Sequence, residues 1–146
     1  MKKAYILLLI LLFNFSVKAQ SYTSNLNTTV VSINSILVKA KMVRFTNSNF
    51  DVFYPIKIKA NLQGNVFCVD SIADENTMSK RLIFNLFKVN SFVIKGNEIQ
   101  AMGKNQKPVV TIFIGNQYTK ALKKEMDALG YICNSYSKLN PKYKCE

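Results

Sequence analysis

The sequence predicts an α+β fold, in which a mainly antiparallel sheet of about five or six strands carries two helices on one face, preceded by a cleaved signal peptide. Two segments with turn chemistry, Gln63-Gly64-Asn65 and Gly96-Asn97-Glu98, each separate apolar stretches and indicate antiparallel hairpins. The apolar run Val109–Ile114 is followed by the amphipathic segment Asn116–Leu129, which indicates a buried strand that leads into a helix. A small all-β barrel with a terminal helix is the competing architecture.

The amino terminus has the three parts of a signal peptide. Lys2 and Lys3 form a positive head, Ala4–Phe13 is an apolar run, and Val17-Lys18-Ala19 before Gln20 fits the small-residue cleavage rule. The run is shorter than the roughly 20 residues of a spanning helix, although an uncleaved membrane anchor is the alternative. Residues 1–19 are therefore expected to be removed, which predicts a secreted or periplasmic bacterial protein with no integral membrane segment after cleavage.

Length and charge bound the mature protein. The chain has 146 residues and a formal net charge of +12, and removal of residues 1–19 takes away three lysines and no acid, which leaves 127 residues and +9. This length suits one domain. We expect a single α+β domain over residues 20–132 and a Cys-containing tail over residues 133–146.

The first half of the mature chain predicts a lead-in and three strands. Residues 21–29 are polar without an apolar period, so we expect a flexible segment. In Val30–Phe45, apolar residues at even positions alternate with lysines, which predicts a strand, with a helix over Ser32–Val43 as the alternative. Ile56–Leu62 alternates strictly and predicts a half-buried strand, from which Val66–Val69 returns as a hairpin partner.

The second half predicts a short helix and another hairpin. Leucine, isoleucine and phenylalanine recur in Ser79–Val89 at a helical spacing, and Asp70, Asp74 and Glu75 precede this segment as candidate helix caps. The second hairpin pairs Ser91–Lys95 with Ile99–Met102.

The last strand and helix form the expected centre of the fold. Pro108–Ile114 carries no charge, so we expect a central strand that is covered on both faces. Four apolar residues of the helix that follows are spaced to face the sheet: Tyr118, Leu122, Met126 and Leu129. Gly130 is expected to end this helix.

The absence of histidine excludes several chemistries. Without it, the serine triad, the Cys–His dyad and His-ligated zinc cannot form, and the five glycines are scattered singly, so no phosphate-binding loop exists. Carboxylate pairs and a serine–lysine site stay open, but the acidic cluster at Asp70, Asp74 and Glu75 suits helix capping better than catalysis. We therefore expect no enzyme activity, no metal and no cofactor.

The three cysteines suggest a disulfide in an exported chain. A bridge between Cys133 and Cys145 would tie down a polar tail, and a loop of that length contributes about 3 kcal/mol in the chain-entropy model. Cys68 competes as a partner, since spacing alone cannot fix connectivity.

Lysines and aromatic residues form the candidate binding site. If the strands of Val30–Phe45 and Ile56–Leu62 pair, their lysines share one solvent face, which would attract nucleic acid, anionic glycan or lipid headgroups. Neighbouring aromatic rings could add stacking, although lysines on a sheet also serve solubility alone. The candidate residues are Lys39, Lys41, Lys57, Lys59, Phe50, Phe53 and Tyr54.

These observations favour an exported, basic binding or inhibitor-like module that recognises a protein or an envelope component. A polyanion binder that uses the lysine face, with an anionic polymer or a membrane surface as partner, is the alternative. The sequence carries no motif that is specific to a family.

Overall fold

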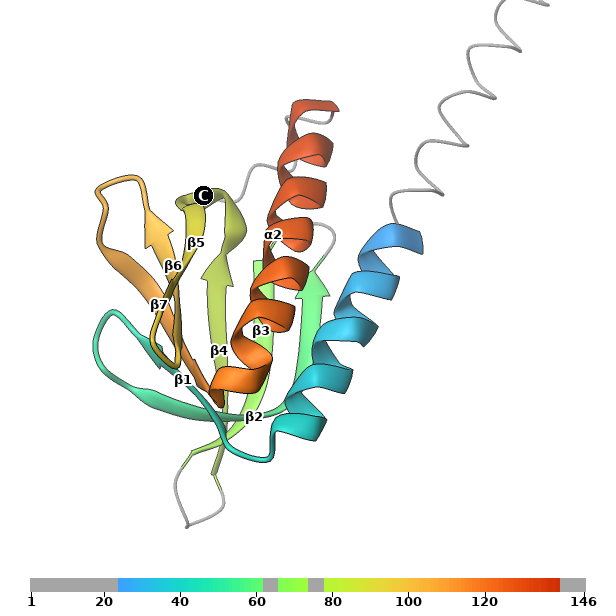
Figure 1. Ribbon diagram of the computed structural model, residues 1–146. Coiled ribbons are helices and arrows are strands. Elements are labelled where there is room, and N and C mark those ends of the chain that lie inside the picture. Colours follow the sequence, from blue (N-terminus) through green and yellow to red (C-terminus); the bar gives the residue numbers. More distant parts are fainter. Residues whose placement is uncertain (1–23, 62–65, 74–77, 140–146) are drawn as a thin grey trace, which may run out of the picture.

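The computed structural model describes residues 24–61, 66–73 and 78–139, and these form one antiparallel sheet with two α-helices (Figure 1). The predicted α+β class is confirmed, with seven strands in the described ranges. The strands are β1 Val43–Asn47, β2 Val52–Asn61, β3 Val66–Ala73, β4 Met78–Asn85, β5 Val89–Lys95, β6 Glu98–Gly103 and β7 Pro108–Ile114. The helices are the N-terminal helix, residues 24–40, the short 3₁₀ helix η1, Leu86–Lys88, and α2, Asn116–Leu139.

The sheet consists of two meanders that join in the middle. Its strand order is β4-β3-β2-β1-β7-β6-β5, so the chain runs outward from β1 to β4, crosses to the opposite edge and returns through β7. β1 and β7 pair along their length, with Phe45 opposite Ile112. This pairing places β7 between β1 and β6, as its apolar sequence predicts.

One core lies between the sheet and both helices. Alternate residues of β7 are buried in it, namely Val110, Ile112 and Ile114. Leu122, Met126 and Leu129 of α2 enter the same core, together with Leu26 and Ile33 of the N-terminal helix. The other residues of β7 are half-buried, except Pro108, which is exposed, so the expectation that β7 is covered on both faces is wrong.

The N-terminal helix replaces the strand predicted over Val30–Phe45 and the flexible lead-in from residue 24. Its core contacts follow the helical period, with Leu26, Thr29 and Ile33 buried. The hydroxyl of Thr29 donates to the carbonyl oxygen of Asn25, 2.9 Å away, which lets threonine stay within the helix. The helical alternative is therefore correct for most of this segment.

β4 and η1 replace the helix predicted over Ser79–Val89. β4 pairs with β3 along its full length, and the buried residues Val69 and Leu82 lie opposite each other. Asn85 ends the strand, and its side-chain oxygen accepts a hydrogen bond of 2.8 Å from the Phe87 amide at the start of η1. Asp70 therefore lies in β3 rather than at a helix cap, while Asp74 and Glu75 lie outside the described residues.

α2 begins at Asn116 as predicted but continues beyond Gly130 to Leu139. Gly130 is thus an interior helical residue and not a C-terminal stop. Cys133 lies on this added length and is buried, so it belongs to the helix and not to a tail. Both predicted hairpins are present as β2–β3 and β5–β6, and Gly96 adopts a φ of 59° in the second turn.

Candidate functional site

The predicted lysine face does not form as a sheet surface. Lys39 lies in the N-terminal helix, and Lys41 follows that helix with a φ of 56° before β1 begins. Lys57 and Lys59 do lie on β2, but their side chains are outside what the structure describes. The premise that all four lysines share two paired strands is wrong, because the first pair belongs to a helix and its exit.

The three candidate aromatic residues have different surroundings. Phe53 packs in the core opposite Phe45, so it cannot contact a ligand. Phe50 is 84% exposed and Tyr54 is 50% exposed. Two of the three rings are therefore available on the surface.

Asn47 builds the turn that presents Phe50. Its side-chain oxygen accepts from the amides of Asn49 and Asp51 at 2.9 and 3.0 Å, and its side-chain nitrogen donates to the Asp51 carboxylate at 2.9 Å. Within this turn Phe50 has a φ of 66°, a left-handed conformation that a bulky residue rarely adopts. The hydrogen bonds of Asn47 hold the exposed ring at the tip of the β1–β2 hairpin.

Exposed apolar side chains continue from this tip along β2. Every second residue from 50 to 56 is apolar and exposed, and we call these four residues the β2 ridge: Phe50, Val52, Tyr54 and Ile56. The register shifts between Pro55 and Lys57, so that β2 buries Phe53 before this bulge and Ile58 after it. Strict alternation over Ile56–Leu62 therefore fails at Ile56, which is exposed.

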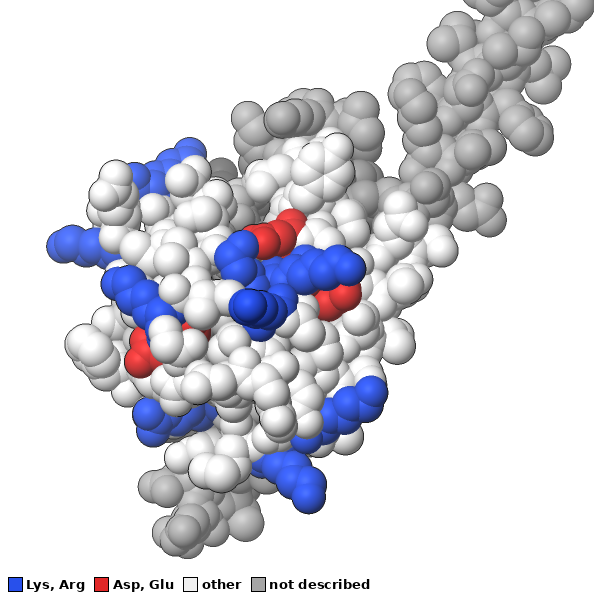
Figure 2. Space-filling model, in the orientation of Figure 1, with Lys and Arg blue, Asp and Glu red and all other residues white. Residues whose placement is uncertain are grey.

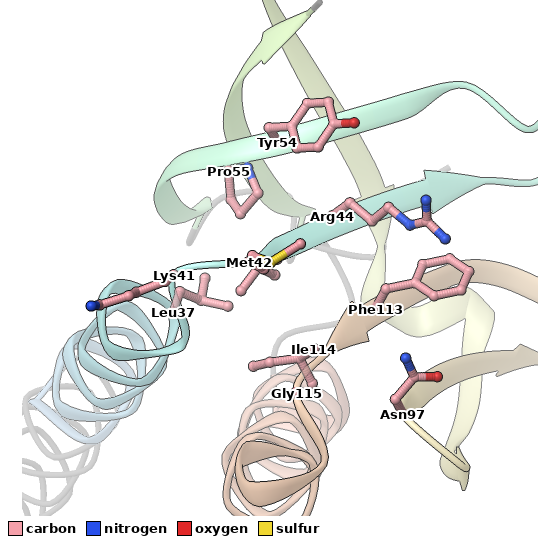
Figure 3. A pocket seen from close by; sticks show the side chains of 11 residues that line it. Leu37, Lys41, Met42, Arg44, Tyr54, Pro55, Asn97, Phe113, Ile114 and Gly115 are labelled. Carbon is pink, nitrogen blue, oxygen red and sulfur yellow. The ribbon is translucent and has the colours of Figure 1, made fainter.

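An open groove of about 690 Å³ lies at the end of the sheet where the N-terminal helix stops and α2 begins (Figure 3). Tyr54 belongs to both the ridge and the groove. The lining residues come from the two helix ends, three strands and the β5–β6 turn: Leu37, Lys41, Met42, Val43, Arg44, Tyr54, Pro55, Asn97, Phe113, Ile114 and Gly115. Most of them are apolar.

Three hydrogen bonds fix the walls of this groove. The Met42 amide donates to the Ala40 carbonyl oxygen at 2.6 Å, which turns the chain from the helix into β1. The Tyr118 hydroxyl donates to the Lys39 carbonyl oxygen at 3.1 Å and joins α2 to the end of the N-terminal helix. The Ile114 amide donates to the Asn97 carbonyl oxygen at 3.0 Å, which holds the β5–β6 turn beside β7.

Arg44 is one of the two cationic residues that line the groove, the other being Lys41. Arg44 lies directly opposite Phe113 in the β1–β7 ladder, and its guanidinium carbon is 4.1 Å from the centre of the Phe113 ring. Stacking of this kind orients the guanidinium group. Its N–H groups point outward in the guanidinium plane and are not covered by the ring, so they can donate to other partners. Within the described ranges no carboxylate pairs with Arg44, and none of the described lining residues is acidic.

The lysines contribute less to this site. Figure 3 shows the amino group of Lys41 directed away from the other lining side chains. On the face drawn in Figure 2, lysine and arginine side chains are spread over several patches and do not form one continuous area. Arg44 is therefore the cation best placed to contact a molecule in the groove.

Three other kinds of feature concern the described part of the chain: metal sites, membrane-spanning helices and the predicted disulfide. Among residues 24–61, 66–73 and 78–139, no group of three metal-ligating side chains comes together. None of the helices in these ranges has the length and apolar character needed to cross a membrane. Cys145 lies outside the described residues, so the Cys133–Cys145 bridge stays a prediction.

No protein-family model, curated protein or solved structure matches the chain. Function must therefore be argued from the residues of the groove and the ridge. Sequence reasoning named Lys41 and Tyr54 of the groove and Phe50 of the ridge but missed Met42, Arg44 and Phe113. The available signal was an arginine among many lysines, but its stacking partner is 69 positions away, from 44 to 113, and only the β1–β7 pairing brings the two together.

Proposed function

We propose that the protein is an exported, non-enzymatic binding module that recognises an anionic, partly apolar component of the envelope or its surroundings. The observation that carries this proposal is the groove at the end of the sheet, where Arg44 lies among apolar side chains without a carboxylate partner in the described ranges. Mostly apolar walls with a few oriented polar groups are typical of binding sites.

The β2 ridge supports the same proposal. Single exposed apolar residues are ordinary, whereas the ridge combines Phe50 in the β1–β2 turn with three exposed apolar residues at alternate positions of β2. Tyr54 belongs to this ridge and also lines the groove. The lack of histidine supports a binding role over catalysis, because the common acid–base and nucleophile-activating pairs cannot be built. Export is supported by the signal-like sequence of residues 1–19.

The polyanion alternative has less support. It requires many cations on one surface, whereas Lys39 and Lys41 lie on and after a helix, and the charges in Figure 2 are dispersed. Salt separates the two possibilities, because polyanion affinity falls steeply between about 50 and 200 mM salt.

The test is capture of ligands from envelope and secreted fractions by the chain from Gln20 to Glu146, compared with Tyr54→Ala and with Lys104→Gln. Lys104 is exposed in the β6–β7 turn, outside the groove, and serves as the charge control. We expect one component that is retained at about 200 mM salt by the wild type and Lys104→Gln and is lost with Tyr54→Ala. Equal retention by the wild type and both variants would contradict the proposal.

A further inference from the structure

We infer that the groove binds a small amphiphilic anion, with its carboxylate on Arg44 and its alkyl body against the apolar wall, which deepens the proposed function and rests on it. The ligand class is a monomeric alkyl carboxylate of medium chain length. Its chemistry is derived from three properties of the groove: the charge at one side, the apolar wall at the other and the volume.

The charge selects the head group. Guanidinium presents N–H donors in a planar fork that matches the two oxygens of a carboxylate. The Phe113 ring covers one face of the Arg44 guanidinium, so a ligand can approach only its edge or its other face. Glu98 lies opposite Phe113 in the β6–β7 ladder and its carboxylate accepts a hydrogen bond of 3.2 Å from Gln100, so it is engaged on the far side of the ring from Arg44.

The apolar wall selects the body. Met42 is 84% exposed although its side chain is apolar, and Leu37 and Ile114 lie beside it in Figure 3. Methionine adapts its shape to flexible chains, and an alkyl ligand would remove this surface from water. The opposite wall, Tyr54 and Pro55, is also largely apolar.

The volume limits the size. A groove of about 690 Å³ lies within the range of small-molecule sites, roughly 300–1,000 Å³. A single alkyl chain with one carboxylate suits this space.

The experiment is calorimetric titration of the chain from Gln20 to Glu146 with decanoate, decanol and decyltrimethylammonium. Decanoate should bind saturably with one site, and each CH₂ removed in shorter carboxylates should weaken binding about fourfold. Decyltrimethylammonium should bind at least about tenfold more weakly than decanoate, because Arg44 repels its head group. Equal affinity for the anion and the cation would overturn the inference.

Variants identify the site. Arg44→Gln should weaken decanoate about tenfold and leave decanol unchanged, since it removes a charge-assisted interaction only. Met42→Glu should abolish decanoate binding. Because the Met42 side chain is exposed, this substitution should not unfold the protein, so lost binding would reflect the groove itself. The matched control Lys104→Gln removes one exposed cation elsewhere, and weakening equal to that of Arg44→Gln would overturn the inference in favour of diffuse charge.

Vesicles distinguish a free acid from a membrane lipid as the source of the anion. Phosphatidylglycerol carries a phosphodiester and no carboxylate, so vesicles that contain it should not compete with decanoate. Competition that Arg44→Gln prevents would show that the anion is a lipid phosphate and would overturn the assignment of a carboxylate. Vesicle binding that is independent of Arg44, with no decanoate binding, would overturn the inference. If capture still requires Tyr54 but decanoate does not bind, the ligand class is wrong while the proposed function stands.

Discussion

Asn34 connects the N-terminal helix to the sheet through one side chain. Its side-chain oxygen accepts from the Ile58 amide at 2.9 Å and its side-chain nitrogen donates to the Ile58 carbonyl oxygen at 3.2 Å. β2 pairs with β1 only at Val52 and Phe53, so the backbone of Ile58 has no β1 partner and Asn34 satisfies it instead. Burial of unpaired backbone groups is costly, which makes this contact structural.

We predict that Asn34→Ala lowers the free energy of unfolding by about 1–3 kcal/mol, because both groups of Ile58 lose their partner. Asn34→Asp should also destabilise, since a carboxylate cannot donate to the carbonyl oxygen. Urea denaturation measures the change. Ser35→Ala, an exposed neighbour on the same helix, is the control, and an equal effect of the two alanine variants would contradict the assigned role.

For single residues, the sequence predicts the surroundings of some side chains and not of others. The sequence offers Phe53 and Tyr54 together as candidate binding residues, and of these two neighbours only Tyr54 is exposed. The difference is decided by the pairing of Phe53 with Phe45. Asn34 has no local signal, because its partner is 24 positions away.

Among the elements, α2 is longer than its sequence pattern predicts. Gly130 has the features of a helix stop, but the helix continues through it, and a Cβ at this position would meet Phe92 at an ordinary contact distance of 3.6 Å. The core contacts of the nearby Leu129 and Cys133 stabilise the added turns. Burial thus overrides the local preference of glycine.

We predict that Gly130→Ala raises the free energy of unfolding by about 0.5–1 kcal/mol, since alanine is favoured within a helix. If the helix ended at Gly130 in a left-handed conformation, the same substitution would lower the free energy of unfolding. The sign of the change therefore shows whether Gly130 lies inside the helix or at its end. Gly96→Ala is the control and should destabilise, because Gly96 has a φ of 59°. Thermal unfolding by circular dichroism measures both.

A second prediction concerns which residues of the N-terminal helix are buried. Ile33→Ala should cost about 2–5 kcal/mol because Ile33 is fully buried, whereas Val38→Asp should be nearly neutral because Val38 is 77% exposed. A strand with the even positions buried would reverse this order. Chemical denaturation of the two variants therefore tests the corrected assignment.

The elements with purely local signals are the ones that the sequence predicts. β7, the β5–β6 hairpin and the start of α2 each have clear boundaries in glycine, proline or asparagine. The predictions for the N-terminal helix and β4 are wrong, because a short apolar spacing suits both a helix and a strand. Only the element that packs or pairs with the segment decides which of the two structures forms. For β4 that partner is β3, which pairs with it residue by residue.

In the whole molecule, the β1–β7 pairing joins the two meanders and also builds the groove. Phe45 is fully buried between Phe53 on β2 and Ile112 on β7. The reverse face of the same pairing carries Arg44 and Phe113. Stability and the candidate site thus depend on one long-range contact, which no local sequence pattern specifies.

We predict that Phe45→Ala lowers the free energy of unfolding by about 3–5 kcal/mol and that unfolding remains a single transition, because the core spans both meanders. Calorimetry and circular dichroism should report the same midpoint. Two separate transitions in either variant or wild type would show that the meanders fold independently. Thr46→Ala, on the less buried face of β1, should have a much smaller effect.

The most direct measurement of the central claim is an amide shift map of the isotope-labelled chain when the captured envelope component is added. The account predicts that the largest shifts occur at Val43, Arg44 and Ile114, the backbone positions around the groove, with smaller shifts along the β2 ridge. Shifts confined to the β5 edge, or spread evenly over the lysines of α2, would contradict the assignment of the groove as the recognition site.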